Sequence, residues 1–382
     1  MRQFFSLLKW ALLTLLLAPI AMYVTVLFIN LQDTAPSTQS KQYLAQIAEI
    51  DHSLTLNQQD NAYIFTLGFD AAKDDSPMTT GLELKKVLLE KDLLNPVNRQ
   101  QKPHYQLVQL PLESCLAEDD FLVVCKANLE QSSNLAKLLA KNHWLIERYQ
   151  QLLQMPRWQD SPHFNADISA MPFQQLLLAQ KLYLLDIYQN IDSTSAELIV
   201  AAIERDMLFW LKISSNTHIL LNKMVSVSAI SVNMQLGEVI LSQPPIEPNI
   251  ATLPTSWNKP MAAAVLSLNK AKLGEWIYFT RTIASAQADD VSADTASQIA
   301  SSLLSPLMQN QDTANRYAAI LTNSGIQTDC DQGLSIDGIS SYIYNPLGKY
   351  ILCTGMPSFN AYQMTLDKLE QQRQALITRL KI

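Results

Sequence analysis

Glycine is scarce in this chain of 382 residues. There are nine glycines, and only Gly237 lies between residues 82 and 273. Rossmann and P-loop folds need several glycines clustered after a strand, where the backbone approaches a phosphate closely. Such nucleotide-binding folds are therefore excluded from the central part of the chain. The long stretches without glycine favour helices instead.

Sequence patterns for metal binding and catalysis are also missing. The five histidines include no pair separated by three or four residues, the spacing that places two ligands on one face of a helix. Neither a G-x-S-x-G elbow nor an H-E-x-x-H motif occurs. We therefore expect no catalytic residue of a familiar pattern, no cofactor and no metal ion.

Charge is sparse as well. Charged residues make up 16% of the chain, and the formal net charge is −7. A nucleic-acid-binding domain carries a basic patch, so nucleic acid is not an expected partner. Hydrophobic residues make up 48% of the chain, which is enough to build the core of one large domain or two modest ones.

One hydrophobic run stands out by its length. No charged side chain occurs from Trp10 to Leu31, and about 20 helical residues cross the core of a bilayer. A cleaved signal peptide has a shorter apolar region that ends in small residues, whereas this run continues through Pro19 to Phe28. We therefore predict an uncleaved transmembrane anchor over residues 10–31. A cleaved signal peptide and a buried core helix are the alternatives.

The basic residues near the run predict its orientation. Arg2 and Lys9 precede the run, whereas Asp33 follows it and the next base is Lys41. The positive-inside rule then makes residues 1–9 a cytoplasmic tail. We expect the rest to comprise a linker at 32–41, an α-helical outer domain at 42–243 and a second helical segment, packed on the first, at 244–382.

The cellular setting follows from the same features. No asparagine begins an N-x-S/T sequon, so nothing points to a glycosylated secretory protein. We predict a protein of the bacterial inner membrane with a cytoplasmic N-terminus and with most of the chain in the periplasm.

Four cysteines follow the predicted span, where disulfides persist. We predict the two local pairs, Cys115–Cys125 and Cys330–Cys353, and free buried thiols are the alternative. Ten residues of straight helix cover about 15 Å, whereas a disulfide needs Cα atoms within about 7 Å. The segment from Cys115 to Cys125 must therefore turn back on itself.

The centre of the chain has the pattern of helical hairpins, and the predicted fold class is mainly α with little β. Apolar residues recur at i, i+3, i+4 and i+7 in residues 134–155, as in an amphipathic helix. Three more helices are expected near 172–189, 193–213 and 216–236, with links short enough to make neighbours antiparallel. This block resembles a pair of tetratricopeptide hairpins, with Asn190 in the place of that family's turn glycine.

Two segments leave the element type open. Residues 60–72 suit a strand, or a helix that begins at Asp60 and ends near Gly68. Residues 345–355 suit a short helix capped by Asn345, or a hairpin that turns at "NPLG". Further helices are expected at 40–50, at 78–91, at 258–285 with an interruption near Gly274, and at 359–380.

Several charged side chains fall on apolar helical segments, namely Arg148, Asp206, Lys223 and Glu275. Buried charges are costly unless they are paired. If the hairpin of helices 193–213 and 216–236 turns near residues 214 and 215, Asp206 and Lys223 lie at the same level on its two arms. We therefore predict a structural ion pair between Asp206 and Lys223, without a catalytic role.

Four stretches spread over most of the chain after the span carry a family resemblance. They are "DNAYIFTLGFDA", "HWLIERYQQLL", "ERDMLFWLKI" and "YNPLGKYIL". Together with the single span they resemble a group of uncharacterised single-pass proteobacterial envelope proteins. The resemblance implies an envelope location, and it implies no activity and no functional residues.

These observations favour a non-enzymatic, membrane-anchored envelope protein whose periplasmic helical domain binds or scaffolds a protein partner. The alternatives are an envelope-modifying enzyme with an unrecognised site and a carrier of an apolar ligand. A cleft with convergent carboxylates would indicate the enzyme, and a closed apolar cavity would indicate the carrier. A groove with neither feature would indicate the binding protein.

Overall fold

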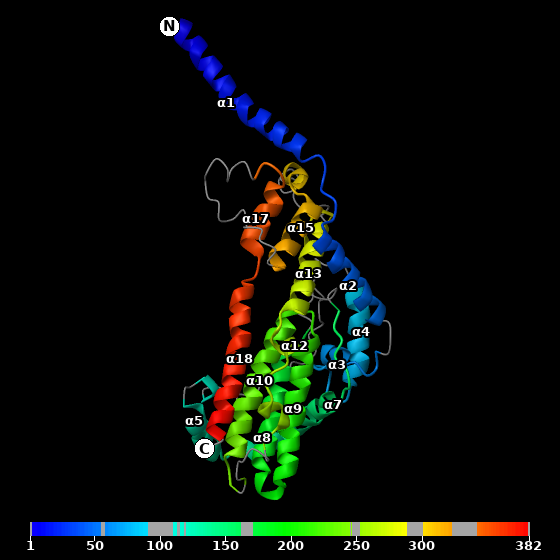
Figure 1. Ribbon diagram of the computed structural model, residues 1–382, viewed down its shortest axis with the longest axis vertical. Helices are drawn as coiled ribbons and strands as arrows, with labels where there is room; N and C mark the ends of the chain where they lie inside the picture. The colour runs from blue at the N-terminus through cyan, green and yellow to red at the C-terminus, as the bar shows by residue number, and fades with distance from the viewer. Residues whose placement is uncertain are drawn as a thin grey trace. The chain divides into compact units, whose positions relative to one another are not determined.

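The computed structural model is built almost wholly of helices (Figure 1). Within the part of the chain that it describes, β structure is limited to a single bridge between Asn61 and Arg157. The prediction of a mainly helical chain with little β is therefore confirmed. The structure describes residues 2–54, 58–90, 110–112, 115–117, 120–161, 171–244, 246, 253–288, 301–322 and 342–380.

The chain forms two compact units, and both are discontinuous in sequence. Unit 1 comprises residues 1–49 and 276–357, and unit 2 comprises residues 50–275 and 358–382. This division differs from the expected boundary at 243/244. The reason is that the C-terminal helix packs on helices far earlier in the chain, and no local sequence signal reports such a return.

Unit 2 is organised around one helix, α10 (Leu220–Leu241). It lies beside α8 (Phe173–Gln189), α9 (Ala196–Asn216) and α18 (Phe359–Leu380) (Figure 1). Apolar side chains surround α10 on most sides, as expected for a helix buried in a core. Its fully or nearly fully buried apolar residues include Val227, Ala229, Ile230, Met234, Leu236, Val239, Ile240 and Leu241.

Shorter helices complete unit 2. Gly68 follows α3 (Ala62–Leu67) and Gly81 lies in α4 (Pro77–Glu90), and both allow the backbones of these helices to touch. A Cβ on Gly68 would lie 2.1 Å from the Pro77 carbonyl oxygen, and a Cβ on Gly81 would lie 1.9 Å from the Ile64 carbonyl oxygen. The elements are α3 (Ala62–Leu67), α4 (Pro77–Glu90), η1 (Cys115–Ala117), α5 (Phe121–Glu130), α6 (Leu135–Lys141), α7 (His143–Leu153), η3 (Ile191–Ser193), α11 (Thr255–Asn258) and α12 (Ala263–Leu266).

Both open segments are helical. The 60–72 segment forms α3, whose N-cap is Asn61 rather than Asp60, because the Asn61 side chain accepts a hydrogen bond from the Tyr63 amide. The 345–355 segment forms α17 (Pro346–Gly355), capped by Asn345 as one alternative predicted. The strand and the hairpin are therefore wrong.

Two expected helices are divided differently. The single helix predicted over 134–155 breaks at Asn142 into α6 and α7. The interruption expected near Gly274 is wrong, because α13 (Asn269–Ala288) runs through it and the break lies earlier, at Ser267. Ser267 has an extended backbone, and its hydroxyl accepts a hydrogen bond from the Asn269 amide at the start of α13.

Unit 1 combines two segments that are far apart in the sequence, residues 1–49 and residues 276–357. Its N-terminal part comprises α1 (Arg2–Ile29) and most of α2 (Thr38–Leu54). Its later part comprises most of α13, a turn of helix at 301–304, η6 (Ser305–Leu307), α15 (Asn310–Leu321) and α17.

A buried asparagine, Asn345, joins these segments in unit 1. Its side-chain oxygen accepts hydrogen bonds from the amides of Gln309 (2.9 Å) and Gly348 (3.1 Å), and its side-chain amide donates to Asp312 (2.8 Å). Its own backbone amide donates to the Asn30 side chain at 2.7 Å. Asn345 also has a left-handed backbone, with φ of 52°, which asparagine tolerates better than most residues.

Two substitutions of Asn345 separate the contribution of its side-chain hydrogen bonds from that of its left-handed backbone. In Asn345→Gly and Asn345→Ala alike, buried partners lose their hydrogen bonds, which should cost about 2 kcal/mol or more. Asn345→Ala should be less stable than Asn345→Gly by about a further 1 kcal/mol, because alanine resists the left-handed conformation. Hydrogen exchange of the α15 and α17 amides in the detergent-solubilised chain measures both differences. Equal exchange in the two variants would show that the backbone conformation carries no cost.

Candidate functional site

The most elaborate polar cluster of unit 2 surrounds a buried carboxylate, Asp206 of α9. It accepts hydrogen bonds from the Tyr149 hydroxyl, from the Gln180 side-chain amide at 2.9 Å and from the Asn233 side-chain amide at 2.8 Å. Burial raises the pKa of Asp206 to about 6, although these hydrogen bonds act to lower it. Its contacts tie α9 to α7, α8 and α10.

This cluster is closed to solvent. The Trp210 indole donates to the Tyr149 hydroxyl at 2.8 Å, and the Trp257 indole donates to the Asn233 side-chain oxygen at 3.1 Å. Each side chain of the cluster is therefore hydrogen-bonded to a helix other than its own. Because each of these side chains is buried, a ligand cannot reach the carboxylate. We therefore assign the cluster to the core and not to a binding site.

Lys223 of α10 lies in a different cluster, and the predicted ion pair with Asp206 is wrong. Its ammonium donates to the backbone oxygens of Ser214 (2.7 Å), Ala264 (3.2 Å) and Val265 (2.5 Å). Burial, with a smaller effect of nearby Lys270, lowers the pKa of Lys223 to about 7.

The position of the hairpin turn explains the error. Helix α9 continues to Asn216 and α10 begins only at Leu220, so the turn centres near residue 218 rather than between 214 and 215. A shift of about 3.5 residues in the turn moves the facing residue on the other arm by about seven, or two helical turns. Lys223 therefore faces the end of α9 at Ser214, and Asp206 faces Asn233.

A second buried carboxylate, Asp160, lies at the N-terminus of α10. Its Oδ2 accepts hydrogen bonds from the Thr217 hydroxyl and from the Asn222 side chain at 3.2 Å. Its Oδ1 accepts a hydrogen bond from the His218 backbone amide at 2.9 Å and lies 3.1 Å from His218 Nδ1. Burial acts to raise the pKa of Asp160, but the contacts with His218 and Thr217 outweigh it and lower the pKa. In the sequence Asp160 lies between Pro156 and Pro162, and no pattern there predicts this role.

Arg148, noted in the sequence for its place on an apolar face, is also structural. Its guanidinium donates to backbone oxygens of the loop that follows α3, including those of Phe69 (2.9 Å), Ala71 (2.8 Å) and Ala72 (2.8 Å).

In the described part of the chain, no cluster of three or more histidine, cysteine, aspartate or glutamate side chains could hold a metal ion.

The candidate binding site is a groove of unit 2 that we call the α10–α18 groove. Its volume is about 610 Å³, which is in the range of ligand-binding clefts. Apolar side chains from α10, α18 and η1 form much of its lining, and hydroxyl, amide and ammonium groups form the rest. The lining residues are Leu116, Lys181, Met224, Val227, Ser228, Ser231, Val232, Gln235, Thr365, Lys368, Leu369 and Gln372.

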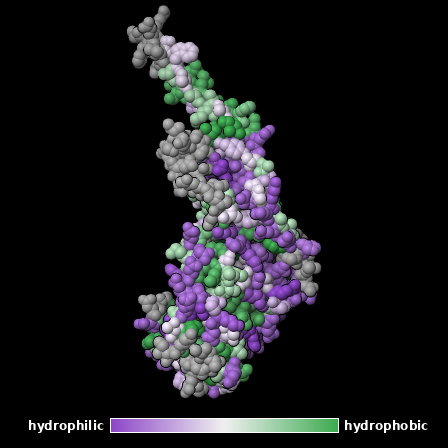
Figure 2. Space-filling view, in the orientation of Figure 1, coloured by the Kyte–Doolittle hydropathy of each residue, from purple (hydrophilic) through white to green (hydrophobic). Residues whose placement is uncertain are grey.

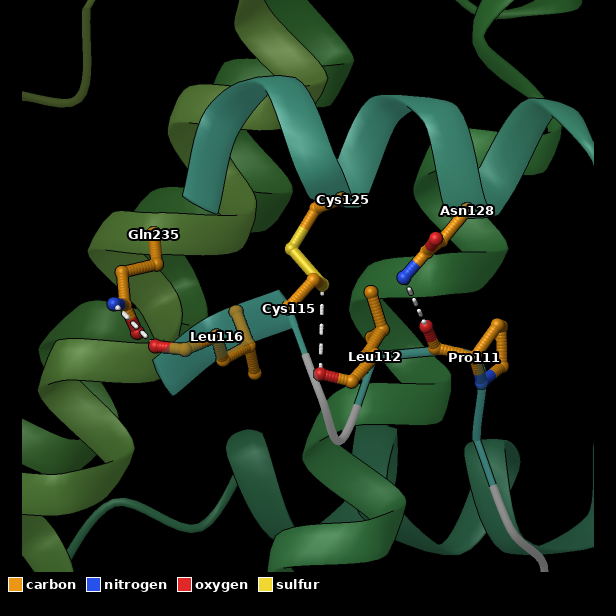
Figure 3. The surroundings of a disulfide bond; sticks show 7 residues. All are labelled: Pro111, Leu112, Cys115, Leu116, Cys125, Asn128 and Gln235. Atoms are coloured by element: carbon orange, nitrogen blue, oxygen red, sulfur yellow. Dashed lines mark hydrogen bonds between the residues drawn. A yellow bond between two sulfur atoms is a disulfide. The ribbon is translucent and has the colours of Figure 1, made fainter. Parts of the chain in front are cut away.

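The Cys115–Cys125 disulfide shapes one edge of this groove. It joins η1 to α5 with a Cα–Cα distance of 5.1 Å, so the segment turns back as the spacing predicts. Figure 3 shows Leu116, next to Cys115, with its carbonyl oxygen accepting a hydrogen bond from the Gln235 side chain of α10 at 3.1 Å. The Asn128 side chain of α5 donates to the Pro111 carbonyl oxygen at 3.4 Å. The disulfide therefore holds Leu116 in position at the groove edge.

The other predicted disulfide is only partly within the described residues. Cys353 lies in α17 and is disulfide-bonded, whereas Cys330 lies outside the described residues. The Cys330–Cys353 pairing stays a prediction.

Polar contacts hold the two long walls of the groove together. The Ser231 hydroxyl of α10 donates to the Gln372 side chain of α18 at 2.9 Å. Further along, Arg379 of α18 forms a two-pronged ion pair with buried Glu238 of α10, with distances of 2.8 and 2.7 Å. This paired geometry is the strong form of an arginine–carboxylate contact. The groove is therefore a built feature of the helix packing.

The groove has a positive charge over an apolar floor. Lys181 and Lys368 line it, and no aspartate, glutamate or histidine is among its described lining residues. Neither lysine makes a hydrogen bond or ion pair with any residue that the structure describes. In a chain whose net charge is −7, these two ammonium groups form a local site for a negatively charged partner group.

We predict that Asp206 makes unit 2 less stable as the pH rises. The pKa of Asp206 is about 6 in the folded chain against an ordinary value of 3.8, so the folded state binds more protons between these values. Stability should fall by about 3 kcal/mol as the pH rises from about 4 to above 6. Asp206→Asn should remove this part of the slope, measured by denaturant unfolding of the solubilised chain with tryptophan fluorescence. Asp192→Asn, at an exposed position, is the control, and an unchanged slope in Asp206→Asn would contradict the assignment.

We also predict that Asp206 and Lys223 contribute independently. Lys223→Met removes a donor from three backbone carbonyl oxygens, of which that of Val265 keeps the Ser214 hydroxyl as another donor, and should cost about 2 kcal/mol. The two side chains share no partner, so the losses in Asp206→Asn and Lys223→Met should add within about 0.5 kcal/mol in a double-mutant cycle at pH 7. A coupling energy well above that value would contradict this independence and indicate that the two side chains form an ion pair.

The comparisons with known proteins give no family for this chain. No protein-family model, no curated protein and no solved structure matches it. The residues of the groove and of α1 are therefore the basis on which a function is assigned.

Proposed function

We propose that this chain is a membrane-anchored, non-enzymatic envelope protein that binds a protein partner in the α10–α18 groove. The anchor is α1. Its Lys9–Ile29 part is long and apolar enough to cross a membrane, and none of its residues is fully buried inside the protein. Figure 2 shows hydrophobic residues over much of the visible surface of α1. Helix α10 passes the same length and composition test, but most of it is buried in unit 2.

The proposed topology has the N-terminus in the cytoplasm and the rest of the chain in the periplasm of a bacterium. Arg2 and Lys9 before the apolar run support this orientation. The Cys115–Cys125 disulfide supports it as well, because disulfides persist in the periplasm and are rare in the cytosol.

The helical arrangement of unit 2 suits a binding role. Helices α8, α9 and α10 follow one another through short links, and this supports the tetratricopeptide-like arrangement that we include in the proposal. The other wall of the groove, α18, comes from the C-terminal end of the chain and is not part of that resemblance.

The observation that carries the proposal is the chemistry of the groove. Lys181 and Lys368 lie beside an apolar floor that includes Val227, Val232 and Leu369. An amphipathic segment with acidic and apolar side chains complements such a surface, because its charges can meet the lysines while its apolar side chains leave water. The absence of a carboxylate among the described lining residues favours binding over acid–base catalysis.

Site-directed photo-crosslinking in intact cells tests this proposal. A benzophenone amino acid at Ser228, an exposed lining residue of α10, should crosslink to one partner protein. The crosslinked peptide of that partner should contain acidic and apolar side chains. The same amino acid at Ala201, an exposed position of α9 outside the groove, should not capture it.

Charge reversal provides the matched control. Lys181→Glu with Lys368→Glu should abolish the crosslink, because the acidic segment would then meet negative charge. Lys137→Glu with Lys141→Glu changes the net charge equally at exposed positions of α6 and should leave the crosslink intact. Equal yields from the two double variants, or equal capture from Ser228 and Ala201, would refute the groove as the partner site.

A further inference from the structure

The last two turns of α1 have two different sides. Tyr23, Val26, Leu27 and, just past the end of the helix, Asn30 follow the i, i+3, i+4, i+7 pattern of one helix face, and all four are partly or fully buried. Residues on the other side are open, and Val24 and Phe28 are 56% and 74% exposed. One face of the apolar helix is therefore covered by protein at a level where the opposite face is bare.

Specific hydrogen bonds hold this contact. The Tyr23 hydroxyl donates to the Leu303 carbonyl oxygen at 2.7 Å. The Asn30 side-chain amide donates to the Ile343 carbonyl oxygen at 2.8 Å, and the Gln309 side chain donates to the Asn30 carbonyl oxygen at 2.8 Å. The 301–307 segment is thereby fixed at the level of Tyr23, and Ile343 is fixed at the level of Asn30.

The 301–307 segment carries an exposed apolar pair next to its contact with Tyr23. Leu303 and Leu304 are 50% and 48% exposed, and they are adjacent to the backbone oxygen that Tyr23 contacts. Tyr23 lies six residues before the end of α1 at Ile29, which is about 9 Å along the helix axis. The apolar part, Lys9–Ile29, is about 31 Å long, close to the thickness of the hydrocarbon core of a bilayer.

We propose that Leu303 and Leu304 insert into the leaflet from which α1 emerges, so that unit 1 stands partly in the membrane interface. The inference rests on α1 being the membrane anchor of the proposed function. Val24 and Phe28 need an apolar medium on the open side of α1, and the leucine pair lies at the same level on the covered side. A bilayer that surrounds α1 at that level also surrounds Leu303 and Leu304.

Lipid is the occupant that the geometry favours. The leucine pair is fixed directly beside the apolar helix, so its surface is continuous with a surface that the bilayer covers. The hydroxyl of Tyr23 has its partner in the Leu303 backbone, as a polar group at this depth requires. Residues 301–307 are then an interfacial segment that fixes the depth and tilt of unit 1 at the membrane surface.

Depth measurements on the full chain in lipid nanodiscs test this inference. Single variants Leu303→Cys, Leu304→Cys, Val24→Cys and Leu198→Cys would each carry an environment-sensitive fluorophore, and label bound by the native chain gives the background. The nanodiscs contain phosphatidylethanolamine and phosphatidylglycerol with plain or brominated acyl chains. We expect brominated lipid to quench the labels at Leu303 and Leu304 about as strongly as that at Val24, and iodide in the water to quench only the label at Leu198, an exposed residue of α9 in unit 2.

The outcomes separate this inference from the anchor. Lipid quenching at Val24 combined with iodide quenching at Leu303 and Leu304 would overturn the inference and leave the anchor standing. Iodide quenching at Val24 would overturn the anchor itself, and the inference with it.

The native chain offers a measurement without any substitution. Lipids that carry a photoreactive group near the middle of the acyl chain should label peptides of α1 and of residues 301–307, and should not label the α9 peptide that contains Leu198. Labelling confined to α1 would contradict the inference. A crosslink from 301–307 to a second copy or to another protein, in place of lipid, would also overturn it.

Discussion

The burial of α10 is the constraint on which the rest of unit 2 depends. This helix lies in the core, yet it carries buried polar side chains at Asn222, Lys223, Asn233 and Glu238 and a partly buried one at Gln235. A buried polar group is costly unless it is hydrogen-bonded, so each of these side chains requires a partner from elsewhere in unit 2. The partners belong to the loop before α8, to the end of α9 and α12, to α9 itself, to η1 and to α18. The polar positions of a single helix thereby attach most of the elements around it.

The same attachments create the groove. Glu238 and Ser231 bind α18 along one side of α10, and Gln235 binds the disulfide-bridged segment at Leu116. The groove therefore lies between elements that are each fixed to the same helix, and this gives it a defined shape before a partner binds. A preformed site loses less conformational entropy on binding than one that must first become ordered. The positive groove and the interfacial segment proposed for unit 1 would both suit the proposed membrane-anchored binding protein.

Much of the secondary structure and one disulfide followed from local patterns. Apolar periodicity located α8, α9, α10 and α18, and the ten-residue cysteine spacing implied the turn between η1 and α5. The segments at 60–72 and 345–355 stayed open because a short apolar run suits either element, and burial against neighbours decides between them. The Asp206–Lys223 pairing failed because a small error in a turn is magnified along the two arms of a hairpin. Asp160 had no local signal, since all its partners except Trp158 lie 57 to 62 residues away.

By itself the sequence determined the properties that depend on near neighbours: helical character, the long uncharged run that begins at Trp10, and the closure of the Cys115–Cys125 loop. Only the tertiary structure decided which buried charges meet, that the C-terminal helix returns to α10, and that Asn30 at the end of α1 is held by residues more than 300 positions later. The physical reason is range. Periodicity and spacing reflect interactions within a few turns of a helix. The groove and the contacts of α1 with the later segments of unit 1 arise instead from pairs far apart in the chain, whose register depends on where every intervening helix begins and ends.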